Sequence, residues 1–127
     1  MIYGIGIDLV EIDRVERMLA QHGNRFSERV LAQSEQEAFS ACVRPAFFLA
    51  NRFAAKEALS KALGTGLRYP VTLHSISVRS EASGRPQLAF HGALPAYLEG
   101  CGVARAHLSL THERGMACAM VVLETDG

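Results

Sequence analysis

A helix-forming run from Arg52 to Gly66 constrains the possible folds of this chain more than any other stretch. Alanine and leucine, the strongest helix formers, fill its middle, and Gly64 stands where a left-handed C-terminal cap is expected. We therefore predict a long helix that begins near Ala46 and ends in a tight Gly64-Thr65-Gly66 turn. The rest of the chain is expected to support this helix.

Two stripes of this predicted helix differ in character. The first is apolar and is expected to face the core; its members are Phe48, Ala55, Leu59 and Ala62. The second places the carboxylate of Glu57 one turn before the ammonium of Lys61, beside Ala50 and Ala54. Spacing alone favours a solvated ion pair, which would contribute about 0.2–0.5 kcal/mol. A second carboxylate, that of Asp8, is what favours a functional interpretation.

The N-terminal segment Met1–Val10 alternates with the period of a β-strand. One face would carry Ile5, Ile7 and Leu9, and the other Gly4, Gly6 and Asp8. Because glycines weaken a strand, their use beside an acid indicates that some group approaches this face closely. An equally acceptable alternative is that the strand ends near Asp8 and that the acid caps the next turn, since Asp is a poor strand residue.

Two capping-box patterns predict short helices after this strand. Asp13 and Glu16 would open a helix over residues 14–21, and Ser34 and Glu37 would open another that stops before Pro45. This part of the chain holds the only local concentration of basic side chains with apolar anchors; they are Arg14, Arg17, Arg25, Arg29, Phe26 and Val30.

The C-terminal half alternates as strands joined by turns. We predict strands over residues 73–79 and 86–91, a short helix over 93–99, and a hairpin of strands 104–111 and 116–123. Both faces of the last strand are apolar, so a helix must cover one and a helix or another subunit the other. Together these elements predict an α+β fold: a small mixed domain with an antiparallel sheet wrapped around one long helix.

The composition bounds the class of protein. At 127 residues the chain is long enough for one domain, residues 1–127, and too short to expect two. A formal net charge of zero provides no global attraction to nucleic acid or to a membrane surface. Three cysteines at unrelated spacings are expected to stay reduced, and no secretory signal or membrane-spanning run is present. We therefore expect a soluble cytoplasmic protein.

Asp8 and Glu57 are the strongest candidates for chemistry. The sequence has no Gly-x-Ser-x-Gly elbow, no His-Glu-x-x-His motif, and no Walker or Gly-x-Gly-x-x-Gly phosphate loop. Two carboxylates without a histidine or cysteine cluster suit Mg²⁺, which keeps several waters and often bridges acids to substrate phosphates. Isolated histidines such as His22, His74 and His91 are interpreted as structural or solvated.

Four ordered blocks of the sequence resemble the holo-[acyl-carrier-protein] synthases, the small bacterial type of 4'-phosphopantetheinyl transferase. These blocks are residues 4–10 (Gly-Ile-Gly-Ile-Asp-Leu-Val), residues 52–66, Gly84-Arg85-Pro86, and residues 108–112 (Leu-Ser-Leu-Thr-His). They match in content, order and separation, and they span essentially the whole chain.

The resemblance implies a 4'-phosphopantetheinyl transferase fold and a reaction. In this family coenzyme A donates 4'-phosphopantetheine to a serine of apo-acyl carrier protein, adenosine 3',5'-bisphosphate is released, and the product supports fatty acid biosynthesis. The family forms homotrimers with active sites between subunits, which would cover the two-sided apolar strand. Magnesium is the expected metal, with manganese as an alternative.

The resemblance also implies roles for individual residues. Asp8 and Glu57 would hold the metal, and Glu57 and Lys61 would be catalytic, the serine proton passing to a metal-held water oriented by Glu57 or else to Lys61. The residues expected to bind coenzyme A are Arg52, Lys61, Gly64, Thr65, Gly66, Arg85, Pro86 and His112. The residues expected to bind the carrier protein are Arg14, Arg25 and Phe26.

Two hypotheses from other functional classes remain open at this point. A magnesium-dependent phosphohydrolase or nuclease could use the same acids, although zero net charge disfavours the nuclease form. A non-catalytic oligomeric binding module could instead have Asp8 as a turn cap and Glu57–Lys61 as a surface pair. Dependence on metal and on coenzyme A would separate these classes.

Overall fold

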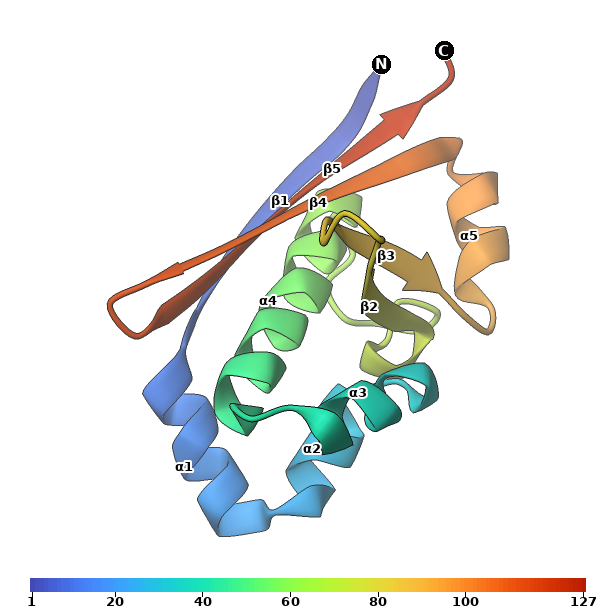
Figure 1. The fold of residues 1–127 in the computed structure, drawn as a ribbon. Helices are drawn as coiled ribbons and strands as arrows, with labels where there is room; N and C mark the ends of the chain where they lie inside the picture. The colour runs from blue at the N-terminus through green and yellow to red at the C-terminus, as the bar shows by residue number, and fades with distance from the viewer.

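The computed structural model describes residues 1–127 and shows an α+β fold built around helix α4 (Figure 1). The long strands β1, β5 and β4 cross one side of α4, and three short helices gather near its N-terminal end. In chain order the elements are β1 (Ile2–Glu11), α1 (Ile12–His22), α2 (Asn24–Val30), the 3-10 helix η1 (Gln33–Glu35), α3 (Gln36–Ala41), α4 (Pro45–Leu63), the 3-10 helix η2 (Leu73–Ser75), β2 (Ile76–Ser80), β3 (Pro86–Phe90), α5 (Leu94–Gly100), β4 (Val103–Glu113) and β5 (Met116–Thr125).

Two antiparallel sheets form the β part of the fold. The larger has the order β1-β5-β4, and the smaller pairs β2 with β3. The predicted C-terminal hairpin is confirmed, with Arg114 (φ 52°) and Gly115 (φ 76°) forming its two-residue turn. Positive φ at both central residues is typical of the type I' turn, whose twist matches that of the flanking strands.

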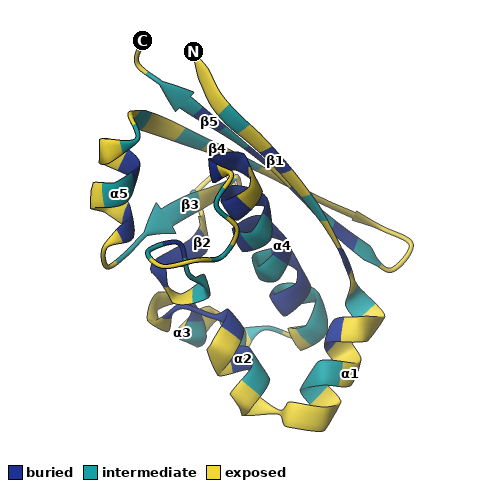
Figure 2. Cartoon of the chain, turned by 180° about the vertical axis from the view of Figure 1, so that it is seen from behind, coloured by how far each residue is buried: buried dark blue, intermediate teal, exposed yellow.

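Helix α4 is buried on most of its circumference, as the dark blue ribbon in Figure 2 shows. The predicted apolar stripe lies in the core, but so do Ala50 and Ala54 of the second stripe. The reason is that β1 and β5 pack on one side of the helix while other elements pack on the remaining sides. None of the helices is both long and apolar enough to span a membrane.

The close approach predicted at the N-terminal glycines is confirmed, and the approaching group is the backbone of α4. A Cβ at Gly4 would overlap the carbonyl oxygen of Ala62. A Cβ at Gly6 would overlap the oxygen of Ala58 and lie 2.7 Å from the nitrogen of Ala62. Strand and helix backbones therefore touch without an intervening side chain.

The outer face of the large sheet is uncovered and apolar. On β5 the inward residues Ala117, Ala119, Val121 and Leu123 are fully buried beneath α4. On the opposite face Ile5, Ile7 and Leu9 of β1 are 58%, 57% and 62% exposed, and Met120 of β5 is 43% exposed. The helix thus covers one of the two apolar faces predicted for the final strand, and the other is left open.

The predicted helix starts were wrong in their capping residues. Helix α1 begins at Ile12 with Glu11 as its N-cap and without a side-chain cap from Asp13, because the chain runs directly from β1 into the helix. The amide of Ile12 donates instead to the carbonyl of Gly115, 2.9 Å away. Ser34 lies inside the 3-10 helix η1, where the carboxylate of Glu35 accepts from the amide of Ala32.

The glycine contact generates a stability prediction. We expect Gly6→Ala to lower the free energy of unfolding by about 3 kcal/mol, because the new methyl group forces the strand away from α4. Gly100→Ala is the matched control, since no atom lies within 4 Å of its added methyl group. Urea titration followed by circular dichroism measures both variants. Equal stability of Gly6→Ala and wild type would contradict the direct backbone contact.

Candidate active site

Asp8, Glu57 and Lys61 lie together where β1 crosses α4. Strand β1 continues to Glu11, and Asp8 sits within it opposite Ala119, so the alternative of a turn cap is excluded. The side chain of Asp8 faces α4 because it shares the sheet face of Gly4 and Gly6.

Lys61 pairs with Asp8 and not with Glu57. Its Nζ atom lies 3.0 Å from Oδ1 of Asp8 and 3.1 Å from the carbonyl oxygen of Ile7. The surface ion pair between Glu57 and Lys61 that spacing alone favoured is not formed. The carboxylate of Asp8 is 15% exposed, so this cation and anion meet at the edge of the core and not in open solvent.

A cavity of about 520 Å³ opens beside the two acids. The acids form part of its wall, and apolar side chains from β1, α1, α2, α4 and β5 form most of the rest. Its lining residues are Asp8, Leu9, Val10, Glu11, Arg14, Val15, Met18, Phe26, Phe53, Glu57 and Met116. The structure therefore brings the predicted metal ligands and two of the predicted carrier-binding residues, Arg14 and Phe26, to one cavity.

Negative charge accumulates at this cavity. Partial burial, with the charge of Asp8 nearby, raises the pKa of Glu57 above its ordinary value, and Lys61 opposes this shift only in part. The donor set consists of carboxylate oxygens, which hard divalent cations prefer, and Asp8 already accepts a cationic partner in Lys61. Glu11 also lines this cavity, but no third acid, histidine or cysteine joins Asp8 and Glu57 in a group that could hold a metal. The residues therefore fit an ion such as Mg²⁺ that takes its remaining ligands from water and phosphate.

A smaller cavity of about 150 Å³ adjoins the first along α1 and α2. Arg25 and Arg29 line it together with Met18, His22 and Phe26. Since Met18 and Phe26 line both cavities, a continuous surface of basic and apolar side chains leads from the helices to the two acids.

The glycine turn after α4 has the predicted form. Gly64 adopts the left-handed conformation (φ 77°) and caps the helix. Its amide donates to the carbonyl of Lys61, and the amides of Thr65 and Gly66 both donate to the carbonyl of Ser60. In this conformation the helix cap therefore uses all three backbone amides of the turn.

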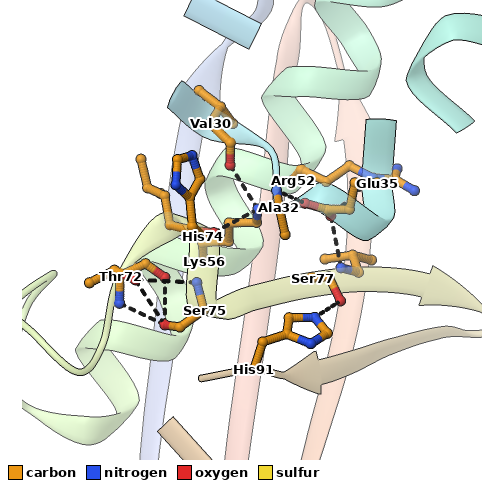
Figure 3. A network of polar contacts seen from close by, with 12 residues as sticks. Val30, Ala32, Glu35, Arg52, Lys56, Thr72, His74, Ser75, Ser77 and His91 are labelled. Atoms are coloured by element: carbon orange, nitrogen blue, oxygen red, sulfur yellow. Dashed lines mark hydrogen bonds and ion pairs between the residues drawn. The ribbon is translucent and has the colours of Figure 1, made fainter. Parts of the chain in front are cut away.

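Arg52, one of the predicted coenzyme-binding residues, does not lie beside Asp8 and Glu57. Its guanidinium lies 3.7 Å from the centroid of the Phe48 ring. Its Nε atom lies 3.8 Å from Oε2 of Glu35 (Figure 3). The side chain is only 17% exposed, and burial lowers the pKa of Arg52 despite the nearby carboxylate. Its position on α4 directs it toward Glu35 and away from Glu57.

Three other predicted coenzyme-binding residues lie outside the cavity that Asp8 and Glu57 line. Arg85 and Pro86 line a separate cavity of about 600 Å³ with residues 105–110 of β4. The ring of His112 packs edge-on against Phe47, with the centroids 4.7 Å apart. Within one chain, therefore, these residues are not brought to Asp8 and Glu57.

Sequence analysis missed a buried ion pair on α4. Lys56 is fully buried, and its Nζ atom lies 2.6 Å from Oε1 of Glu35 (Figure 3). The heptad spacing of Lys56 between Leu49 and Leu63 could have indicated a buried lysine. Nothing local could have indicated its partner, which lies 21 residues earlier.

Comparisons with known proteins agree with this geometry. The 4'-phosphopantetheinyl transferase superfamily matches residues 4–115. The holo-[acyl-carrier-protein] synthase of Nitrosospira multiformis is 48% identical over 124 residues, which cover 98% of this chain and 99% of that protein.

Solved structures similar to this chain are also holo-[acyl-carrier-protein] synthases. The crystal structure of holo-[acyl-carrier-protein] synthase from Neisseria meningitidis has a TM-score of 0.95 at 40% identity, covering 98% of this chain and 100% of the other. That of the Bacillus anthracis synthase in complex with CoA (3',5'-ADP) has a TM-score of 0.82 at 39% identity, covering 99% of each.

The charge at the cavity generates a prediction about stability and pH. The pKa of Glu57 is raised on folding, so its ionisation at neutral pH opposes folding, and this penalty is absent below its unfolded pKa of about 4.3. We expect Glu57→Gln to raise the melting temperature at pH 7.5 in a chelator, and the gain to shrink as the pH falls toward 4. Glu37→Gln, on the exposed surface of α3, is the control. A lower melting temperature for Glu57→Gln at pH 7.5 would contradict this assignment.

Proposed function

This chain belongs to the 4'-phosphopantetheinyl transferase superfamily, and we propose that it transfers 4'-phosphopantetheine from coenzyme A to a serine of apo-acyl carrier protein. The products are holo-acyl carrier protein and adenosine 3',5'-bisphosphate. The observation that supports this most strongly is that Asp8, which pairs with Lys61, and Glu57 line a cavity that Arg14 and Phe26 also line. Relatives named holo-[acyl-carrier-protein] synthase, and one solved with coenzyme A, indicate both substrates.

Asp8 and Glu57 are the residues that would hold the metal. A divalent cation bound there, Mg²⁺ with Mn²⁺ as an alternative, would offset the pyrophosphate charge and polarise the phosphorus under attack. Partial burial and the charge of Asp8 raise the pKa of Glu57, and the nearby negative charge of Asp8 supports this assignment because a cation would offset it.

Glu57 and Lys61 supply the remaining chemistry of the proposed transfer. The serine oxygen forms a bond to the phosphorus nearest the pantetheine while the bond to the bridging oxygen of the pyrophosphate breaks. Glu57 orients the water that accepts the serine proton, and Lys61 is the alternative acceptor. Lys61 contributes positive charge to the phosphates and aligns Asp8 through their 3.0 Å ion pair.

The surface from α1 and α2 to the acids would receive the carrier protein. Arg14 and Phe26 line the catalytic cavity, and Arg25 lies on the adjoining cavity beside Phe26. Exposed arginines around an aromatic anchor suit an acidic protein partner, because opposite charge raises the encounter rate while the apolar contact holds the complex.

A homotrimer would complete the coenzyme site. The outer face of the sheet exposes Ile5, Ile7 and Leu9, an apolar surface that a second copy could cover. Arg85, Pro86 and His112 lie outside the acid cavity of their own chain, so a neighbouring subunit would have to supply them. Within each subunit, one core of 21 buried residues supports a single domain over residues 1–127. We place this activity in the cytoplasm, in support of fatty acid biosynthesis.

The transfer reaction itself is the first prediction of this proposal. We expect a purified apo-acyl carrier protein to gain the mass of one phosphopantetheine group when incubated with this protein, coenzyme A and Mg²⁺. Chelation with EDTA should abolish the gain, and Asp8→Asn and Glu57→Gln should each slow it at least about 100-fold. Intact-mass spectrometry measures the product.

Two outcomes would contradict the transfer proposal. No gain of mass with a carrier validated on a known synthase would reject it. Release of phosphate from coenzyme A without a carrier would instead identify a phosphohydrolase. Circular dichroism of both variants is the control, because a folded but inactive variant assigns the loss to chemistry.

The shared site predicts complementation between subunits. Asp8→Asn and His112→Ala should each be inactive alone. Refolding them together should restore about a quarter of wild-type activity, because one site in four then combines an intact Asp8 with an intact His112. The control is a mixture of Asp8→Asn and Glu57→Gln. One subunit supplies both of these acids to a site, so this mixture contains no intact site and should stay inactive. Failure of the first mixture in a sample shown to be trimeric by light scattering would place the whole site in one chain.

A further inference from the structure

The C-terminal end of helix α2 is held by two side chains from distant parts of the chain. The Nζ atom of Lys56 donates to the carbonyl of Val30 at 2.7 Å. The Nε2 atom of His74 lies 2.7 Å from the carbonyl of Glu28 and donates to it, since a carbonyl can only accept. Both carbonyls belong to the last turn of the helix, where positive charge and N–H donors are favourable.

The ammonium group of Lys56 makes two further hydrogen bonds besides the one to Val30. It donates to Oε1 of Glu35 at 2.6 Å and to the carbonyl of Leu73 at 3.0 Å (Figure 3). The carboxylate of Glu35 in turn accepts from the amides of Ala32 and Val78, both at 2.9 Å. The contacts of Lys56 and Glu35 join the end of α2 to α4, η1, η2 and the middle of β2, and His74 of η2 makes a separate contact with α2.

A gain in stability does not by itself explain why the charged pair of Lys56 and Glu35 is buried here. Burial lowers the pKa of Lys56, which shows that its charge is costly here. An apolar pair of similar volume commonly stabilises a core as well as a buried ion pair does. What an ion pair adds is a fixed geometry, because its hydrogen bonds form in only one arrangement of the segments.

These contacts fix the position of α2 relative to the two acids, Asp8 and Glu57. Lys56 directly precedes Glu57, so successive residues of α4 reach in different directions, one to α2 and one to the catalytic cavity. Helix α2 carries Arg25, Phe26 and Arg29, which we call the docking face. The position of the docking face relative to Glu57 therefore depends on the contacts made by Lys56 and His74.

We propose that Lys56, His74 and Glu35 are positioning residues that hold the docking face at the distance from Asp8 and Glu57 at which a bound carrier presents its serine. The proposal rests on the proposed transfer function. These three residues touch no reacting atom, so their loss should weaken productive carrier binding and leave coenzyme A binding intact.

Steady-state kinetics with varied apo-carrier and varied coenzyme A tests the proposal. His74→Ala should raise the KM for the carrier about five-fold, the effect of losing one hydrogen bond, while kcat and the KM for coenzyme A stay within about two-fold. His74→Gln, whose amide can donate in place of Nε2, should restore the wild-type KM. Lys56→Met should raise the carrier KM more than about ten-fold if it folds. Since His74 is exposed, its variants keep the test open if Lys56→Met does not fold.

A destabilised control separates positioning from general stability. Leu94→Ala removes a fully buried side chain of α5, remote from α2, and should lower the melting temperature without changing the carrier KM. Hydrogen exchange of residues 24–31 provides a readout independent of activity. It should accelerate in His74→Ala and Lys56→Met, and it should not accelerate in Leu94→Ala.

The outcomes distinguish this proposal from the function on which it rests. No transfer by the wild-type protein would reject the proposed function, whatever the exchange data show. Transfer by wild type with an unchanged carrier KM in His74→Ala and in folded Lys56→Met would reject the positioning role alone. Equal rises in carrier KM for Leu94→Ala and His74→Ala would contradict the positioning role, because they would show that these contacts affect the KM only through stability.

Discussion

The direct contact between the backbones of β1 and α4 determines where the candidate active site can form. Gly4 and Gly6 permit this contact because each lies against a carbonyl of the helix. Side chains of a strand alternate between faces, so Asp8, two residues after Gly6, projects to the same side as the glycines. A register shift of one residue would turn Asp8 outward and press an isoleucine against the helix backbone. The residues that permit packing and the residue that bears the charge therefore belong to one pattern.

Helix α4 carries opposite arrangements of charge on its two sides. Toward β1, Glu57 and Asp8 place two acids near one lysine, and partial burial together with the charge of Asp8 raises the pKa of Glu57. Toward α2 and β2, Lys56 meets Glu35 in a fully hydrogen-bonded pair. An excess of acids is typical of a site that binds a cationic ligand, whereas an ion pair whose two partners make all their hydrogen bonds within the protein is typical of a structural contact. The helix thus separates the reacting groups from the groups that hold the surrounding segments.

Sequence periodicity predicted those features that depend on neighbours along the chain. The long helix, its cap at Gly64, the inward face of β1 and the C-terminal hairpin follow from spacing and turn chemistry. The pair of Glu35 with Lys56 and the inward course of Arg52 could not be predicted in this way, because tertiary packing alone brings those residues together. The prediction of capping by Asp13 was wrong for a related reason: the chain passes directly from β1 into α1, and the tertiary contact of the Ile12 amide with the carbonyl of Gly115 is made at this junction.

The proposed homotrimer would account both for the uncovered sheet face and for the positions of the predicted coenzyme-binding residues. A monomer that exposes more than half of Ile5, Ile7 and Leu9 leaves apolar surface in water that its own helices cannot reach, since α4 already occupies the other face. At the same time Arg85 and His112 are held by their own packing, beside β4 and against Phe47. The proposed association of copies would cover this apolar face, and a neighbouring copy would supply the residues that one chain does not bring to its acids.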